Sequence, residues 1–142
     1  MSSSRRVLFL SLRPEYADLI LCGDKTVELR RRKPDIQDND IVILYAASPV
    51  KSILGTARVQ SVVQGTVTGI WKEFGSETGI TKRTYESYFD NSSDATAIKL
   101  RKTTRRSEPL TLNSIREIIE GFTPPQSYRY LTAQQGRALI AA

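Results

Sequence analysis

Three charged residues at short spacing form a group that could do chemistry. Lys25, Glu28 and Arg30 bring an ammonium, a carboxylate and a guanidinium to one segment. Such a group can bind a phosphate and orient a proton acceptor. Strict strand alternation would turn Lys25 away from the other two side chains, so a late strand start or strand twist must bring them together. The alternative interpretation is a row of ion pairs on the surface.

A second candidate group surrounds the loop that contains Pro49. Tyr45, Ser48 and Lys51 would supply a stacking face, a hydroxyl and a cation around one nucleotide. A lysine near a ribose 2′-hydroxyl can assist RNA cleavage as a base or as a phosphate clamp. Alternatively, Tyr45 fills the interior and Lys51 is solvated. Glu77 is a weaker third member, because it lies between two turn glycines and is expected to be exposed. The predicted catalytic residues are Lys51, Tyr45, Lys25 and Glu28.

Basic residues are bunched rather than spread along the chain. The run from Arg30 to Lys33 places four positive charges next to the first group, which favours phosphate binding. A solvated guard of an edge strand is the alternative. A second cluster, from Lys99 to Arg106, is interpreted as a flexible hairpin. Residues predicted to contact nucleic acid are Arg30, Arg31, Arg32, Lys33, Ser48, Ser127 and Tyr128.

Composition narrows the classes of partner and chemistry. Lysine and arginine number 21 against 15 acidic residues, a net charge of +6, which favours a polyanionic partner over a merely solvated surface. The chain has one cysteine and no histidine, so the usual zinc ligand sets and the Cys/His dyad are absent. We therefore predict no metal and no cofactor. No apolar run approaches the roughly 18 residues of a membrane span, and we expect a cytoplasmic protein.

Short strands and short helices must position these groups. Pro14 suits the first position of a helix, and Gly23 suits its left-handed C-terminal cap. The residues from 25 to 30 alternate, which predicts a half-buried strand with a polar outer row. Without regular strand and helix alternation, the chain is expected to form one α+β domain over residues 1–142 around a small mixed β-barrel. Strands are predicted over 7–12, 25–30, 41–45, 52–63 and 95–101, and helices over 14–22, 66–74, 80–89 and 112–119. Residues 127–131 are expected to be extended after Pro124 and Pro125.

The segment Gly23-Asp24-Lys25-Thr26-Val27-Glu28-Leu29-Arg30 resembles the G-x-K-x-x-E-x-R core of ASCH domains, which belong to the PUA-like group. Further stretches similar to that family follow in order, so the resemblance covers nearly the whole chain. They lie at residues 10–17, 45–51, 78–82 and 122–131.

Membership of this family would imply a PUA-like barrel with a cleft between barrel and helices, and a ligand that is RNA or a modified nucleoside. Some relatives bind RNA, some cleave single-stranded RNA, and one subgroup deacetylates acetylated cytidine. In that subgroup a lysine, a threonine and a glutamate act together; the lysine matches Lys25, but the threonine falls on Glu28. We therefore predict binding of single-stranded or modified RNA, with metal-independent ribonuclease activity. The alternative is an amidohydrolase acting on an acylated nucleoside such as N4-acetylcytidine.

Overall fold

Six strands form one mixed sheet in the computed structural model, which describes residues 6–142. Residues 1–5 of the predicted domain lie outside the described residues. The strand order is β2-β5-β4-β3-β1-β6, with β1 and β3 parallel and every other pair antiparallel. The strands are β1 Val7–Leu12, β2 Val27–Arg30, β3 Ile41–Ala46, β4 Ser52–Thr66, β5 Asp94–Thr111 and β6 Tyr128–Leu131.

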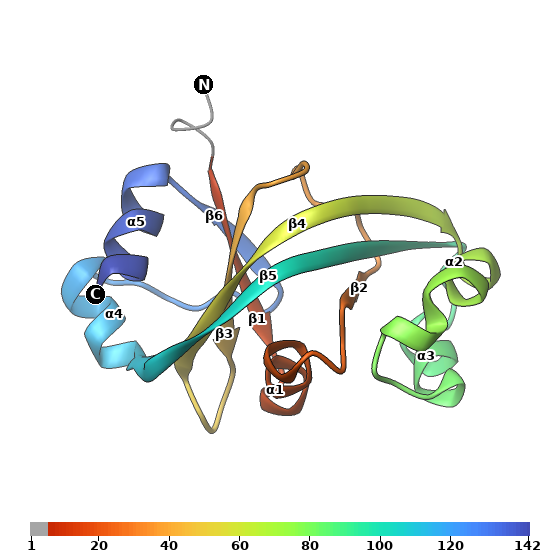
Figure 1. The fold of residues 1–142 in the computed structure, drawn as a ribbon, viewed down its shortest axis with the longest axis horizontal. Coiled ribbons are helices and arrows are strands. Elements are labelled where there is room, and N and C mark those ends of the chain that lie inside the picture. The colour runs from red at the N-terminus through yellow and green to blue at the C-terminus, as the bar shows by residue number, and fades with distance from the viewer. Residues whose placement is uncertain (1–5) are drawn as a thin grey trace.

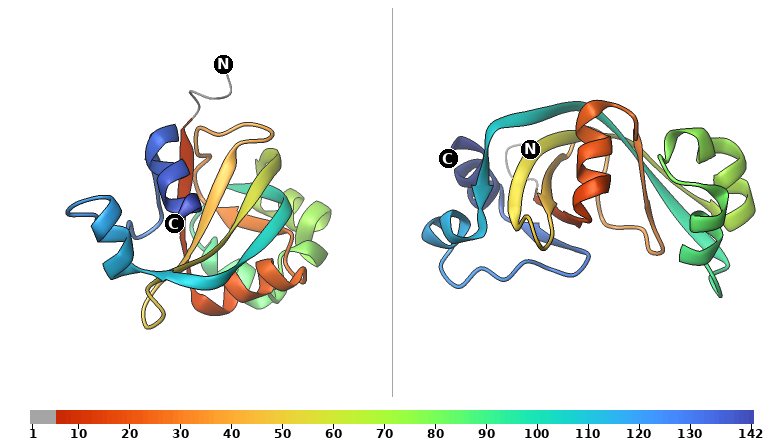
Figure 2. Two further views of the ribbon diagram at one scale, coloured as in Figure 1. Left: turned by 60° about the vertical axis from the view of Figure 1, so that its left-hand side comes forward. Right: turned by 90° about the horizontal axis from the view of Figure 1, so that it is seen from below.

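Short helices cover the ends of this sheet, as expected for the α+β class. Two of them, α2 and α3, lie at one end of the long β4–β5 ribbon, and α4 and α5 lie at the other (Figure 1). Helix α1 lies between these two groups (Figure 2). The helices are α1 Pro14–Cys22, α2 Val67–Phe74, α3 Lys82–Tyr88, α4 Leu112–Ile118 and α5 Ala133–Ala141, with a 3-10 turn, η2, at Gly75–Glu77. No helix in residues 6–142 is both long and apolar enough to cross a membrane.

The first strand and the first helix form where the local sequence predicts them. Strand β1 is buried along its whole length, and Pro14 opens α1 at a position where its missing N–H costs nothing. Gly23 ends the helix with a φ of 92°, a conformation that glycine adopts without strain, and donates its N–H to the Ile20 carbonyl. The predicted strand, helix and cap are confirmed.

The β4–β5 ribbon corrects the prediction for the second basic cluster. The cluster from Lys99 to Arg106 lies inside β5 and is paired with β4, so it is not a flexible hairpin. A register shift between Ile53 and Gly55 marks a β-bulge in the ribbon. A Cβ at Gly55 would lie 2.2 Å from the Thr104 carbonyl oxygen, so the ribbon requires glycine there.

The predicted α+β class is confirmed, but the sheet does not close into the predicted small barrel. Strands β2 and β6 are the two edges of the sheet, and no backbone pairing joins them within residues 6–142. With only four residues, β2 pairs with β5 alone, and side chains cross the gap instead. Arg30 spans it by donating from Nη1 to Ser127 Oγ at 2.7 Å and from Nη2 to the Ser11 carbonyl at 3.2 Å.

Candidate nucleotide-binding cleft

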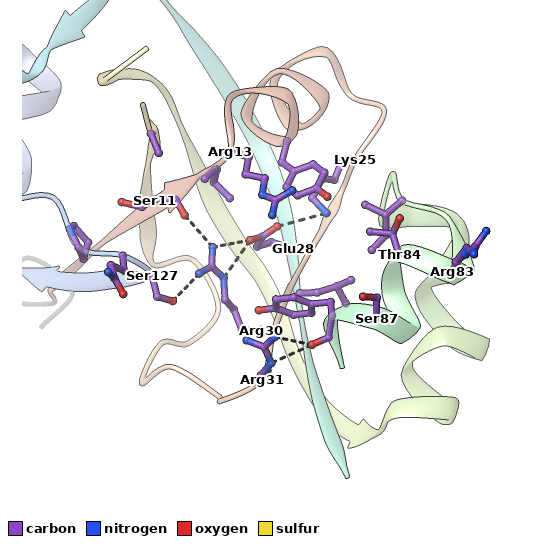
Figure 3. A pocket seen from close by; sticks show the side chains of 18 residues that line it. Ser11, Arg13, Lys25, Glu28, Arg30, Arg31, Arg83, Thr84, Ser87 and Ser127 are labelled. Carbon is purple, nitrogen blue, oxygen red and sulfur yellow. Dashed lines mark hydrogen bonds and ion pairs between the residues drawn. The ribbon is translucent and has the colours of Figure 1, made fainter. Parts of the chain in front are cut away.

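A cleft of about 1010 Å³ opens where the sheet fails to close. Its walls come from the end of β1, the start of α1, strand β2, helix α3 and the segment before β6 (Figure 3). Of the residues that the structure describes, five basic side chains and one carboxylate line it, which makes it strongly positive. These residues are Arg13, Lys25, Arg30, Arg31, Arg83 and Glu28.

The predicted group of Lys25, Glu28 and Arg30 is assembled at the floor of this cleft. Glu28 Oε2 accepts from Arg30 Nη2 at 2.7 Å and from Arg30 Nε at 3.1 Å. Lys25 Nζ lies 3.5 Å from Glu28 Oε1. The meeting is possible because β2 begins only at Val27, so Lys25 precedes the alternating part of the strand. The predicted late strand start is confirmed.

Burial distinguishes this group from a row of surface ion pairs. The exposed fractions are 2% for Lys25, 6% for Glu28 and 9% for Arg30. The predicted polar outer row of this strand is therefore wrong, because its charged side chains face one another and the cleft. Lys25 also donates to the Thr78 carbonyl at 2.6 Å, and its Nζ lies 5.3 Å from the centre of the Tyr16 ring.

Burial lowers the pKa of Lys25 below its usual value of 10.5, because desolvation penalises the ammonium. The Glu28 carboxylate opposes this shift, and the positive charge of Arg30 adds to it. Folding therefore moves the Lys25 ammonium away from water, and this desolvation costs free energy.

This shift predicts how stability depends on pH. Between the lowered pKa and about 10.5, the unfolded chain binds a proton at Lys25 that the folded chain does not bind, so the free energy of unfolding should rise with pH. Urea unfolding from about pH 7 to about pH 10 should show this rise as a difference between wild type and Lys25→Met. Taking the difference removes the pH dependence that comes from the tyrosines whose pKa is raised, because both proteins contain them. A difference in the free energy of unfolding that stays constant with pH would contradict the lowered pKa of Lys25.

Arginines at the rim complete the cleft. Arg31 donates from Nε and Nη2 to the Tyr88 carbonyl at 3.1 and 2.7 Å, and its guanidinium lies 4.1 Å from the centre of the Tyr88 ring. It thereby ties β2 to the end of α3. Arg13 and Arg83 are exposed and enter from α1 and α3. Arg32 and Lys33 are also exposed but do not line the cleft.

Known proteins that are similar in sequence and in fold indicate one family. The ASCH domain model matches residues 10–104. An ASCH domain-containing ribonuclease of Zymomonas mobilis is 36% identical over 137 residues, covering 96% of this chain and 92% of the relative. This chain belongs to the ASCH family.

Solved structures agree with that assignment. A crystal structure of the ASCH protein from Zymomonas mobilis superposes with a TM-score of 0.90 at 36% identity, covering 94% of this ASCH chain and 93% of the other. The N-terminal domain of Staphylothermus marinus McrB superposes with a TM-score of 0.63 at 13% identity, covering 95% and 93%. The second likeness concerns the fold alone.

The second predicted group of this ASCH domain is not assembled in the cleft, because none of its three residues lines it. Tyr45 is 2% exposed and packs against Phe9, with ring centres 5.2 Å apart, so it fills the interior instead of offering a stacking face. Ser48 and Lys51 are exposed in the loop between β3 and β4. Lys51 donates its N–H to the carbonyl of Ala47 at 3.4 Å, and Ala47 lines the cleft. The backbone of Lys51 is therefore one tight turn away from Ala47, a residue that lines the cleft, but Lys51 itself does not line it.

The remaining predicted residues have distinct places in the ASCH domain. Ser127 lines the cleft and accepts from Arg30, whereas Tyr128 is half-buried, with its ring centre 5.7 Å from that of Tyr130. Glu77 is half-buried and does not join Lys51. It binds Lys99 at 2.7 Å and accepts from Thr26 Oγ1 at 3.0 Å. The hydrogen bond from Lys99 lowers the pKa of Glu77.

Our interpretation of the sequence missed several polar residues of the cleft, among them Ser11, Arg13 and Arg83. Ser11 lies within an apolar strand, where a polar residue among buried positions is the one available signal. Arg13 precedes the first residue of α1, and Arg83 lies on α3 far along the chain. Nothing in the local pattern of the two arginines distinguishes them from solvated charges.

Proposed function

We propose that this ASCH domain binds RNA by taking an unpaired nucleotide into the cleft. One observation carries the proposal: a buried Lys25–Glu28–Arg30 group lies at the floor of a cleft whose rim holds exposed arginines. Rim guanidiniums suit phosphates, and a concave site of this size suits a nucleotide better than a duplex. The name of the Zymomonas mobilis relative, a ribonuclease, supports RNA as the partner.

The rim can be tested through the salt dependence of binding. We expect Arg83→Gln to weaken binding of single-stranded RNA about equally for all sequences, and to reduce the slope of log affinity against log salt by about 0.7, the value for one lost phosphate contact. Fluorescence anisotropy over a salt series measures both quantities. Lys72→Gln is the matched control, because Lys72 is exposed on α2 and does not line the cleft. Equal slopes in the two variants would remove Arg83 from the interface.

The amidohydrolase alternative predicts a different salt response. Capture of a neutral acylated nucleoside releases few counterions, so its affinity should hardly change with salt. Glu28 stands where the deacetylating relatives have a threonine, and here its carboxylate is occupied by Lys25 and Arg30. These contacts favour RNA binding over nucleoside deacetylation.

We further propose that bound RNA is cleaved without a metal, with Lys51 stabilising charge on the phosphate. Lys25 is committed to Thr78 and Glu28 and is nearly inaccessible. Lys51 is exposed, one turn from the cleft, and has a left-handed backbone with a φ of 50°, a conformation that is concentrated at functional sites. In this proposal Lys25 and Glu28 hold the floor of the cleft in place, and the side chain of Lys51 contacts the scissile phosphate.

A further inference from the structure

Two aromatic side chains line the cleft among residues 6–142, each on a different wall. Tyr16 comes from the first turn of α1, and Tyr88 is the last residue of α3. Both are half-buried, so part of each ring is accessible. Tyr85 differs from them: it is 1% exposed and donates its hydroxyl proton to the Val67 carbonyl at 2.7 Å, as a core tyrosine does. A ring that stays partly accessible in a cleft is available to a ligand that stacks.

The surroundings of Tyr16 turn its accessible side to the cleft. Lys25 Nζ lies 5.3 Å from the centre of the Tyr16 ring, and Lys25 is only 2% exposed. The same ammonium donates to the Thr78 carbonyl at 2.6 Å. A buried cation therefore contacts the ring from the floor of the cleft, which fills that side. The part of the ring that remains accessible belongs to the cleft that Tyr16 lines.

The first turn of α1 fixes the position of Tyr16. Its backbone N–H donates to the Arg13 carbonyl at 3.0 Å. The next residue, Ala17, and Ile20 one turn later are both 0% exposed and attach the helix to the core. A ring on a helix that is held in this way loses little freedom when a ligand binds, which favours binding.

The ring of Tyr88 is more crowded. The Arg31 guanidinium lies 4.1 Å from its centre, and the Phe89 ring packs against it with centres 4.7 Å apart and planes at 81°. Arg31 is also held there by its two hydrogen bonds to the Tyr88 carbonyl. Tyr88 thus serves mainly to join β2 to α3, and Tyr16 offers the better surface for stacking.

A cation beside Tyr16 suits the rest of a nucleotide. Arg13 is exposed, and its guanidinium lies 6.0 Å from the centre of the Tyr16 ring. A phosphate bound by Arg13 would bring its own nucleotide next to this ring. Unpaired bases stack on aromatic side chains whatever their sequence, because every base has a π-face.

We propose that the ring of Tyr16 is the platform on which the base of the bound nucleotide stacks. The inference rests on the proposed RNA binding and adds the group that holds the base. We expect Tyr16→Leu to lower the affinity for single-stranded RNA about five- to a hundredfold, the loss that follows when a base loses its stacking partner. Tyr16→Phe keeps the ring and should bind as wild type does. Both variants should keep the salt slope of wild type, because no phosphate contact is lost.

The experiment compares two labelled probes of the same length, an oligoadenylate and a ribose-phosphate chain that carries no bases. Fluorescence anisotropy measures the affinity of each protein for each probe, and melting temperatures check that the variants are folded. We expect Tyr16→Leu to lose affinity for the oligoadenylate and to bind the base-free chain as wild type does. Wild type itself should prefer the oligoadenylate by at least the factor that Tyr16→Leu loses, a comparison that needs no variant to fold.

Other results overturn the inference. Equal losses for both probes in Tyr16→Leu would mean that Tyr16 supports the cleft without contacting a base. A loss specific to the oligoadenylate in Tyr88→Leu, but not in Tyr16→Leu, would place the platform on α3. If wild type binds both probes equally, no base is held, and RNA binding through phosphates stands. If wild type binds neither probe, the proposed function itself is wrong, and stacking on Tyr16 is wrong with it.

Discussion

Replacing Glu28 by glutamine should lower the free energy of unfolding by about 3–5 kcal/mol, the usual cost of leaving a buried charge without its partner. Among residues 6–142, Glu28 is the only carboxylate that lines the cleft, and both Lys25 and Arg30 form ion pairs with it. A neutral amide would leave two positive charges in a place with little access to water. Urea unfolding at neutral pH measures the loss.

Glu77→Gln provides the matched control. It removes one ion pair with Lys99, but both partners are 31% exposed, so the expected loss is below about 1 kcal/mol. Adding Lys25→Met to Glu28→Gln should recover part of the stability, because only one buried cation then remains. Similar losses for Glu28→Gln and Glu77→Gln would mean that the floor of the cleft is more hydrated than its burial implies.

The second large effect concerns catalysis. We expect Lys51→Ala to reduce cleavage of single-stranded RNA at least about tenfold, equal to about 1.4 kcal/mol of transition-state stabilisation, while RNA binding changes little. Cleavage should persist in EDTA and leave 2′,3′-cyclic ends, because the 2′-hydroxyl is the expected nucleophile and no metal is required. Gel analysis of end-labelled RNA measures rate and product together.

A second lysine variant distinguishes the two candidate groups. Lys25→Met should alter stability and binding more than the cleavage rate of bound RNA, if Lys25 only positions the cleft. If Lys25→Met abolishes turnover while Lys51→Ala does not, the working cation is at the floor of the cleft. Wild type that binds RNA but leaves it intact in a pure preparation would end the ribonuclease proposal. Binding would still stand.

Local chemistry predicted the elements of this fold well. Pro14 and Gly23 delimit α1, and Thr66 and Thr81 cap α2 and α3 through their side chains. The sequence did not indicate α5, where glutamines and Gly136 weaken the helical pattern. The structure explains this glycine: a Cβ there would lie 2.5 Å from Val7 Cγ2, so glycine lets the helix lie close to β1.

The site was predicted only as far as neighbouring residues could indicate it. The spacing of Lys25, Glu28 and Arg30 identified the group, but alternation alone assigned Glu28 and Arg30 to solvent. Their burial depends on the segment at Ser127, which is 97 residues from Arg30 and becomes its partner only in the folded chain. Local sequence patterns likewise do not predict whether the sheet closes, because closure depends on whether its two edge strands pair.

The most direct test of RNA binding in the cleft is to map the bound RNA on the protein by NMR. Single-stranded RNA is titrated into uniformly ¹⁵N-labelled protein, and the shifts of the backbone amides are followed. We expect the largest changes at residues that line the cleft, from β1, β2, α3 and the segment before β6: Ser11, Arg13, Arg31, Arg83 and Ser127. Changes confined to the basic stretch of β5 from Lys102 to Arg106, with the cleft amides unmoved, would contradict the account.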